Sequence, residues 1–236
     1  MTKNGYLVRF SAKQRVEHVL VMLVFLLLAV TGFPQKFYDT GWAAWTVEAI
    51  GGLDRMRWLH RAAGILFAVI SVVHVTSAAL LVLTGKARAS LVPTKQDFRD
   101  AIGNLRYYLG VSKDPAKFDR FDYRQKFEYW GLVLGGMVMV ATGFMLLYPG
   151  VVARFLPGEL IPASKVAHSN EGLMAFLVVI TWHIYNAHLN PDVFPFDTSI
   201  FTGKISRERM HHEHPLELER IEAEERAREE ASRSAG

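Results

Sequence analysis

Four long apolar segments alternate with polar ones along this chain, and the alternation sets the predicted fold. Each segment is about as long as the ~20 residues that an α-helix needs to cross the hydrocarbon core of a bilayer. The charged residues lie between and after these segments. The pattern predicts an all-α membrane protein, a four-transmembrane-helix bundle. Its spans are residues 16–37, 59–83, 127–148 and 166–189.

Lysine and arginine are unevenly distributed around the four spans. Most of the 27 lie before the first span, in the loop 85–126, or after residue 190. Cytoplasmic loops of membrane proteins carry such an excess, so we expect both termini and this loop on the cytoplasmic side of a bacterial inner membrane. The net charge of +4 follows this topology, so it does not indicate a nucleic-acid partner. The basic residues before the first span are Lys3, Arg9, Lys13 and Arg15.

The polar segments predict two further features. Residues 1–190 form the transmembrane domain, and the highly charged tail 191–236 reads as a solvated helix or a partner-docking arm. Its histidines, including His214, are expected to be solvated. In the loop, Thr94 followed by Asp97 predicts the start of an amphipathic helix. No internal repeat stands out.

Histidines inside the spans are the candidate functional residues, because a polar side chain in a bilayer is costly and needs a partner. The fourth span carries His168 and His183, fifteen residues apart. In an α-helix this step covers ~22 Å and leaves the two side chains within ~60° of each other around the axis. One helix therefore presents two imidazoles at two depths.

Depth along the predicted spans pairs some of these histidines. His60 and His168 both lie toward the outer side. Two imidazoles on facing helices suit axial ligation of a haem iron, which favours electron transfer over oxygen chemistry. With no cysteine in the chain, such haems are held non-covalently. The alternative is interhelical hydrogen bonding alone. Candidates on the inner side are His18, His74, His183 and His188.

The order and spacing of several motifs resemble the cytochrome b (gamma) subunit of membrane-bound formate dehydrogenases. This family includes the cytochrome b subunits of nickel–iron hydrogenase and thiosulfate reductase. The resemblance covers nearly the whole chain. Its motifs are the region of His18, residues 59–64 (Leu-His-Arg-Ala-Ala-Gly), 121–130 (Phe-Asp-Tyr-Arg-Gln-Lys-Phe-Glu-Tyr-Trp), 168–172 (His-Ser-Asn-Glu-Gly), 182–185 (Trp-His-Ile-Tyr) and 203–207 (Gly-Lys-Ile-Ser-Arg) with His214-Pro215.

The resemblance implies haem b at two sites. His60 and His168 would ligate the iron nearer the outside, and His18 with His183 the iron nearer the cytoplasm. His74 departs from the expected pattern: it could replace His18, ligate a third haem with His188, or line a quinone site.

The resemblance also implies a quinone site at the inner haem, formed by polar residues just before the third span. These are Asp122, Arg124 and Gln125. The family member used for comparison has an amide and a glycine in place of Asp122 and Arg124, so the choice between menaquinone and ubiquinone stays open.

The implied function is that of a membrane-anchoring b-type cytochrome subunit of a respiratory oxidoreductase complex. It would pass electrons through stacked haems between a partner and the quinone pool. Substrate catalysis would belong to the partners: iron–sulfur and catalytic oxidoreductase subunits, or a c-type cytochrome. Two alternatives remain. One is a quinol-oxidising cytochrome b that feeds a multihaem or other reductase. The other is a haem-free membrane anchor or proton-relaying transporter.

Overall fold

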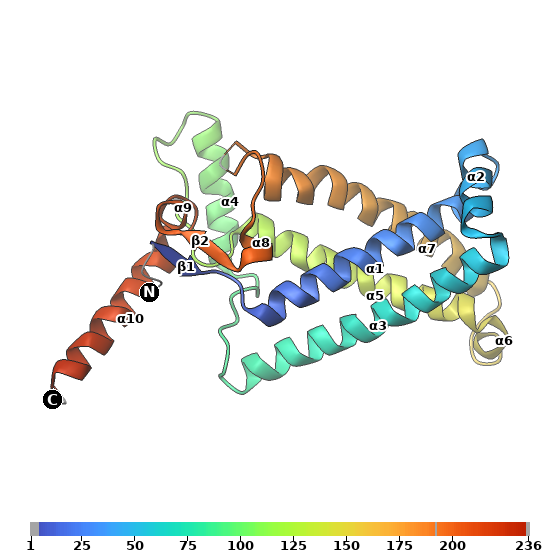
Figure 1. The fold of residues 1–236 in the computed structure, drawn as a ribbon, viewed down its shortest axis with the longest axis horizontal. Coiled ribbons are helices and arrows are strands. Elements are labelled where there is room, and N and C mark those ends of the chain that lie inside the picture. Colours follow the sequence, from blue (N-terminus) through green and yellow to red (C-terminus); the bar gives the residue numbers. More distant parts are fainter. Residues whose placement is uncertain (1–4, 192, 235–236) are drawn as a thin grey trace. The chain divides into compact units, whose positions relative to one another are not determined.

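The computed structural model describes residues 5–191 and 193–234, so Lys3 lies outside the described residues. Contacts between Cα atoms divide the chain into two compact units (Figure 1). The helical unit comprises Ala12–Lys86 and Gly131–Asp197. The polar unit comprises Met1–Ser11, Ala87–Trp130 and Thr198–Gly236, so it unites the N-terminus, the loop and most of the tail.

The prediction of four membrane-crossing helices is confirmed by length and composition. Each helix starts several residues before the predicted apolar segment, because helical hydrogen bonding continues into the more polar residues at the ends, which hydropathy alone does not count. Shorter helices lie in two of the connections: α2 (Gly41–Ile50) between α1 and α3, and α6 (Pro149–Val152) between α5 and α7. The four crossing helices are α1 (Ala12–Lys36), α3 (Leu53–Leu83), α5 (Tyr123–Leu147) and Leu160–Leu189, which starts as α7 (Leu160–Val178).

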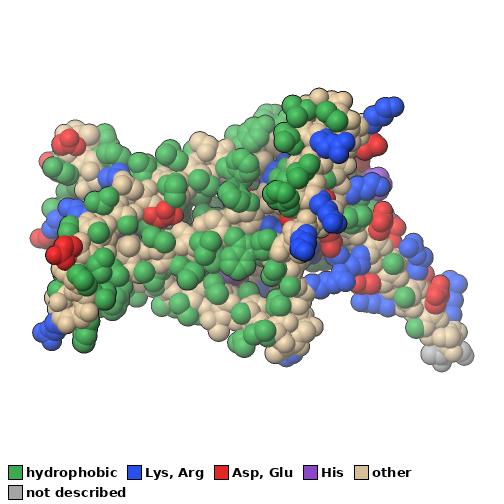
Figure 2. Space-filling model, turned by 180° about the vertical axis from the view of Figure 1, so that it is seen from behind, with side chains coloured by type: hydrophobic (Ala, Val, Ile, Leu, Met, Phe, Trp, Pro, Cys, Tyr) green, Lys and Arg blue, Asp and Glu red, His purple; other side chains and the backbone are tan. Residues whose placement is uncertain are grey.

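The helical unit carries apolar side chains on its outside as well as between its helices. Leu23, Val69 and Leu134 are each more than half exposed. On the face shown in Figure 2, such side chains cover the helices. Where α1 packs on α3, Val24 and Ala63 are buried. An apolar exterior is suited to contact with lipid chains, which offer no hydrogen-bond partners to polar groups.

The fourth crossing helix is not a regular α-helix throughout. After α7 the chain continues as two π-helical turns, η1 (Val179–His183) and η2 (Tyr185–Leu189). A π-helix closes its hydrogen bonds over five residues, so each residue turns less around the axis than in an α-helix. The turn η1, which lies between His168 and His183, therefore reduces the ~60° rotation about the helix axis that an uninterrupted α-helix would place between these two side chains.

The polar unit is built on a two-stranded antiparallel sheet of β1 (Tyr6–Val8) and β2 (Lys204–Ser206), with Leu7 opposite Ile205. Leu7 and Ile205 are buried with Met210 and Leu218. Thus the N-terminal strand and the start of the tail share one small core. The remaining elements of the tail are α8 (Ser199–Thr202), α9 (Arg207–Glu213) and α10 (Pro215–Ser234).

The predicted loop helix is present as α4 (Lys95–Tyr108). The Asp97 carboxylate accepts the backbone N–H of Thr94 at 2.6 Å, which confirms the predicted capping box. Lys126 also donates to Asp97, at 2.7 Å. Burial alone would raise the pKa of Asp97, but the hydrogen bonds from Lys126 and Thr94 outweigh it and lower that pKa.

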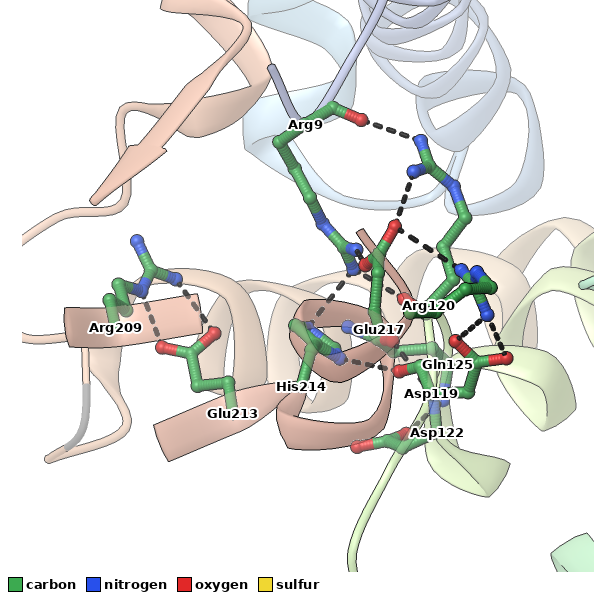
Figure 3. Close-up of polar contacts among 10 residues, drawn as sticks. Arg9, Asp119, Arg120, Asp122, Gln125, Arg209, Glu213, His214 and Glu217 are labelled. Carbon is green, nitrogen blue, oxygen red and sulfur yellow. Dashed lines mark hydrogen bonds and ion pairs between the residues drawn. The ribbon is translucent and has the colours of Figure 1, made fainter. Parts of the chain in front are cut away.

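A buried ionic network joins β1, the loop and the tail (Figure 3). The Arg9 guanidinium and the Glu217 carboxylate are 3% and 2% exposed and pair directly. Arg120 donates to the other oxygen of Glu217 at 2.7 Å and to the backbone carbonyl of Arg9 at 2.6 Å. Burial lowers the pKa of Arg9 to about 10, partly offset by Glu217. The two cations around one carboxylate hold three distant segments together.

His214 is buried in this network, which corrects the expectation that it is solvated. Its Nδ1 lies 2.8 Å from the carbonyl of Asp119 and its Nε2 lies 3.0 Å from Nη2 of Arg9 (Figure 3). A carbonyl only accepts and a guanidinium only donates. The neutral ring therefore carries its proton on Nδ1. Burial, followed by the charge of Arg9, lowers the pKa of His214 to about 4.

We expect acid to destabilise the polar unit through His214. Between pH 6.5 and about 4 the unfolded chain protonates this imidazole and the folded chain does not, so the free energy of unfolding falls as the pH is lowered. The loss is roughly 3 kcal/mol, at about 1.4 kcal/mol per pKa unit. Thermal unfolding of the detergent-solubilised chain across this pH range should show a shallower loss in His214→Gln. An equal pH dependence in both proteins would contradict the assignment.

Candidate haem sites

The outer pair of predicted ligands meets between α3 and α7. The ring centres of His60 and His168 lie 6.3 Å apart, with the ring planes at 80° to each other. Both side chains are half-buried. The structure thus brings together, in one unit, two imidazoles that are 108 positions apart in sequence.

A second pair meets between α1 and η1, the continuation of α7. His18 on α1 and His183 on η1 have ring centres 6.1 Å apart and planes at 35°. Of the two histidines considered for this position opposite His183, the structure places His18 there. His183 is the last residue of the π-helical turn η1. The smaller rotation per residue in that turn changes the direction in which the His183 side chain leaves the helix.

The separation of each pair fits an axially ligated metal. An imidazole nitrogen binds a transition metal at about 2 Å and lies about 1 Å from its own ring centre, so two ligands on opposite sides of one ion have ring centres roughly 6 Å apart. The distances of 6.1 and 6.3 Å meet this condition. A direct imidazole–imidazole hydrogen bond would instead place two ring nitrogens about 3 Å apart.

Two threonines and two glycines complete the outer site. The Thr31 hydroxyl on α1 lies 2.9 Å from Nδ1 of His60. The Thr142 hydroxyl on α5 lies 3.0 Å from Nδ1 of His168. Gly32 and Gly143, the next residues in the chain, lie against the same two rings. All four long helices therefore contribute to this site.

The other two candidate histidines contact residues other than imidazoles in the structure. Nδ1 of His74 lies 3.2 Å from the Glu17 carboxylate, on the neighbouring helix. The ring of His188 stacks on Phe196, with centres 4.0 Å apart and planes at 2°. Neither contact presents the histidine to another imidazole.

The three predicted quinone-site residues contact one another at the start of α5, and Figure 3 labels two of them, Asp122 and Gln125. The Asp122 carboxylate accepts the backbone N–H of Gln125 at 2.8 Å, and the Gln125 side chain accepts the backbone N–H of Asp122 at 3.1 Å. This reciprocal pair caps the helix. Asp122 also accepts from Arg124 at 2.7 Å. The cap fixes Asp122 and Gln125, and the ion pair with Asp122 fixes Arg124. This structural role was not predicted from the sequence.

The threonines and glycines of the outer site were not predicted from the sequence. A signal was available, because the tripeptide Thr-Gly-Phe occurs at 31–33 in the first span and again at 142–144 in the third. It is too short to stand out as a repeat. Its meaning depends on the helix packing that places each copy against a different histidine.

Four apolar helices with two facing imidazole pairs define a helical membrane protein with the donor set of bis-histidine haem sites. The chain belongs to the family described as prokaryotic cytochrome b561, whose sequence pattern matches residues 9–193. It is therefore a multi-pass bacterial membrane protein of the b-type cytochromes, which carry b-type haem and serve respiratory electron transfer.

Similar proteins are cytochrome subunits of formate dehydrogenases. The chain is 24% identical over 232 residues to the cytochrome b556(Fdn) subunit of the nitrate-inducible formate dehydrogenase of Escherichia coli K12, covering 97% of this chain and 99% of that one. It is 25% identical over 189 residues to the formate dehydrogenase cytochrome b556 subunit of Haemophilus influenzae, covering 79% and 73%. The cytochrome b556(fdo) subunit of Escherichia coli K12 is 24% identical over 190 residues, covering 79% and 81%.

Proposed function

We propose that the chain holds two b-type haems, one between His60 and His168 and one between His18 and His183. The observation that carries this proposal is the pair of ring separations near 6 Å on helices of one unit. Two axial imidazoles leave no open position on the iron, so the bound groups would supply one-electron transfer. The protein's own task is to fix the two ligand pairs at two depths in a region from which water is excluded.

We propose no ligand role for His74 or His188. His74 faces Glu17, and His188 stacks on Phe196. A third haem would need these contacts to break. Haem quantification of the purified protein should therefore give two haems per chain, and a value of three would require one of these histidines as a ligand.

The proposed physiological role is that of a membrane-anchoring subunit of a respiratory oxidoreductase complex, linking a partner's redox centre to the quinone pool. The similarity to formate dehydrogenase cytochrome subunits supports it. The partners would be iron–sulfur and catalytic subunits, or a c-type cytochrome in a complex that runs from quinol to another reductase. The bundle and the positions of its histidines serve either direction.

We propose that both termini and the loop 85–126 face the cytoplasm, as the distribution of basic residues indicates. If electrons reach the quinone from outside and its protons come from the cytoplasm, turnover separates charge across the membrane. Each elementary charge moved is worth ~2.3 kcal/mol per 100 mV. The exposed charges of α10, seen as alternating red and blue in Figure 2, would contact a partner on the cytoplasmic side.

The quinone head group is proposed to bind at the start of α5, with Asp122, Arg124 and Gln125 as its polar contacts. The structure supports this by showing a fixed group of donors and acceptors there. Arg124 is the residue best suited to a quinone oxygen, because its guanidinium has five N–H donors and Asp122 engages only some of them.

Optical spectroscopy tests the proposal against its haem-free alternative. Reduced-minus-oxidised spectra of the purified protein should show a b-type α-band, and menaquinol or ubiquinol should reduce it. Absence of the band from folded protein expressed with sufficient haem would support a haem-free anchor or transporter.

The two sites should also differ in electron paramagnetic resonance. Nearly perpendicular ligand planes, as at the outer site, leave two of the iron d-orbitals close in energy, whereas planes at 35° separate them. We expect two low-spin ferric signals at liquid-helium temperature, the more anisotropic from the outer site. Retention of that signal in His60→Ala, with loss of the other, would reverse the assignment.

A further inference from the structure

The outer histidines are held by two matching elements on two different helices. Thr31 and Gly32 of α1 contact His60 of α3, and Thr142 and Gly143 of α5 contact His168 of α7. In each case the threonine hydroxyl meets Nδ1 of the ring and the glycine lies over Cε1. We call these two Thr-Gly elements the outer cradles.

The hydrogen bonds of each threonine determine which ring nitrogen carries the proton. The Thr31 hydroxyl lies 2.6 Å from the Leu27 carbonyl, and the Thr142 hydroxyl lies 2.6 Å from the Val138 carbonyl. A carbonyl oxygen only accepts, so the single hydroxyl hydrogen is directed to it. The hydroxyl oxygen can then only accept from the imidazole. The ring is therefore protonated at Nδ1, and Nε2 keeps its lone pair.

The glycines allow the rings to lie directly against the helix backbone. A Cβ at position 32 would lie 3.0 Å from Cε1 of His60, and one at position 143 would lie 3.2 Å from Cε1 of His168. Both distances are shorter than ordinary van der Waals contact. An alanine would require the ring to give way by a few tenths of an ångström. A free imidazole can shift by that much, whereas the bond to a metal would resist the shift of a ligating imidazole.

We propose that the outer cradles are positioning elements that preset both outer imidazoles as Nε2 ligands, tighten haem binding at that site and lower its reduction potential. The proposal rests on ligation by His60 and His168. A hydrogen bond donated by the second ring nitrogen makes a ligating imidazole more basic. A more basic ligand favours the oxidised iron, hence the lower potential.

Among the described residues, the hydroxyls of Thr31 and Thr142 contact the outer histidines and carbonyls of their own helices, and neither reaches the inner pair. The nearest threonine in sequence to His183 is Thr181, whose hydroxyl donates to the Leu177 carbonyl. Substitutions in the cradles should therefore act on one site only. This asymmetry gives an internal reference within each protein sample.

The test uses Thr31→Val and Thr142→Val in the full-length chain, which remove the acceptor and nearly preserve shape. Outer-site haem affinity should fall about ten- to a hundred-fold, the usual effect of losing such a partner. In protein that retains the haem, redox titration should show a positive shift of the outer midpoint potential and no shift of the inner one. Thr31→Ser and Thr142→Ser, which keep the hydroxyl, should restore both values.

Thr46→Val is the matched control. The Thr46 hydroxyl donates to the Trp42 carbonyl at 2.8 Å, the same backbone bond as in the cradles, but it belongs to α2. It should leave both haems and both potentials unchanged. An outer potential and haem content unaffected by Thr31→Val and Thr142→Val would overturn the proposal.

Alanine substitutions test the glycines separately. Gly32→Ala and Gly143→Ala should reduce outer-haem content while leaving the thermal stability of the haem-depleted protein unchanged, because the free ring can move aside. Gly64→Ala in α3 is the control, since a Cβ there meets no atom within 4 Å. Full haem content in both cradle variants would show that close approach to the backbone is unnecessary.

His60→Ala separates failure of this proposal from failure of the ligand assignment. If His60→Ala removes the outer haem and the threonine variants change nothing, ligation stands and the cradles have no role. If His60→Ala keeps an unaltered outer haem, the ligand assignment itself is wrong.

Discussion

Replacing His168 with alanine is expected to remove one haem and leave the other. The outer pair would lose one of two axial ligands, whereas His18 and His183 form a separate pair with ring centres 6.1 Å apart. Haem content should fall from two per chain to one. The remaining haem should still be reduced by quinol, because the resemblance to the cytochrome b (gamma) subunits implies that the quinone site serves the inner haem. Haem quantification and reduced-minus-oxidised spectra of the purified variant measure both effects.

A histidine outside the pairs provides the control for this result. His188 stacks on Phe196 near the end of the fourth crossing helix, so His188→Ala should retain both haems. Loss of both haems from a folded His168→Ala bundle would argue against two separate sites. Loss of a haem from His188→Ala would restore this residue as a ligand.

Truncation of Glu217 is expected to open the polar unit. The carboxylate is 2% exposed and neutralises Arg9, which is itself buried, and Arg120. Glu217→Ala would leave the Arg9 cation buried beside a second cation, and removal of one partner of a buried ion pair typically costs 3–5 kcal/mol, so we expect about 4 kcal/mol. Hydrogen–deuterium exchange of the β1 and β2 amides in the full-length detergent-solubilised chain should report this loss of protection.

An exposed ion pair of α10 provides the control for the loss of a buried one. Arg226 is 67% exposed and lies 3.9 Å from Glu222, so Arg226→Ala should change protection by less than about 1 kcal/mol. Glu217→Gln, which keeps the shape but not the charge, separates the charge effect from packing. Unchanged exchange in Glu217→Ala would mean that the network does not hold β1 to the tail.

The buried network also changes the view of the tail. The charge pattern of residues 204–236 predicts a solvated helix, because periodicity cannot show that one glutamate in such a run meets two arginines from other segments. Glu217 and His214 are buried because β2 pairs with β1 and brings the tail onto the loop. The far part of α10 keeps the exposed character that its composition indicates.

The quinone-site residues illustrate a limit of transfer by resemblance. The resemblance assigns Asp122 and Gln125 to a quinone site because they are polar residues before a span, and in the structure they cap α5. An Asp followed three residues later by Gln is a capping pattern that could have been recognised from the sequence. Capping and quinone binding are compatible where hydrogen-bond donors stay available to the quinone. The Arg124 guanidinium provides such donors, because Asp122 engages only some of its N–H groups.

The sequence by itself determined the four spans and the histidines within them, because a bilayer imposes length and apolarity locally and makes each intramembrane imidazole conspicuous. The tertiary structure decided that His18, rather than His74, meets His183, and that the fourth helix changes to π-helical turns there. It also decided that two ordinary Thr-Gly pairs lie against two histidines. Such contacts depend on how helices rotate and pack, and no single segment encodes the rotation of its neighbour.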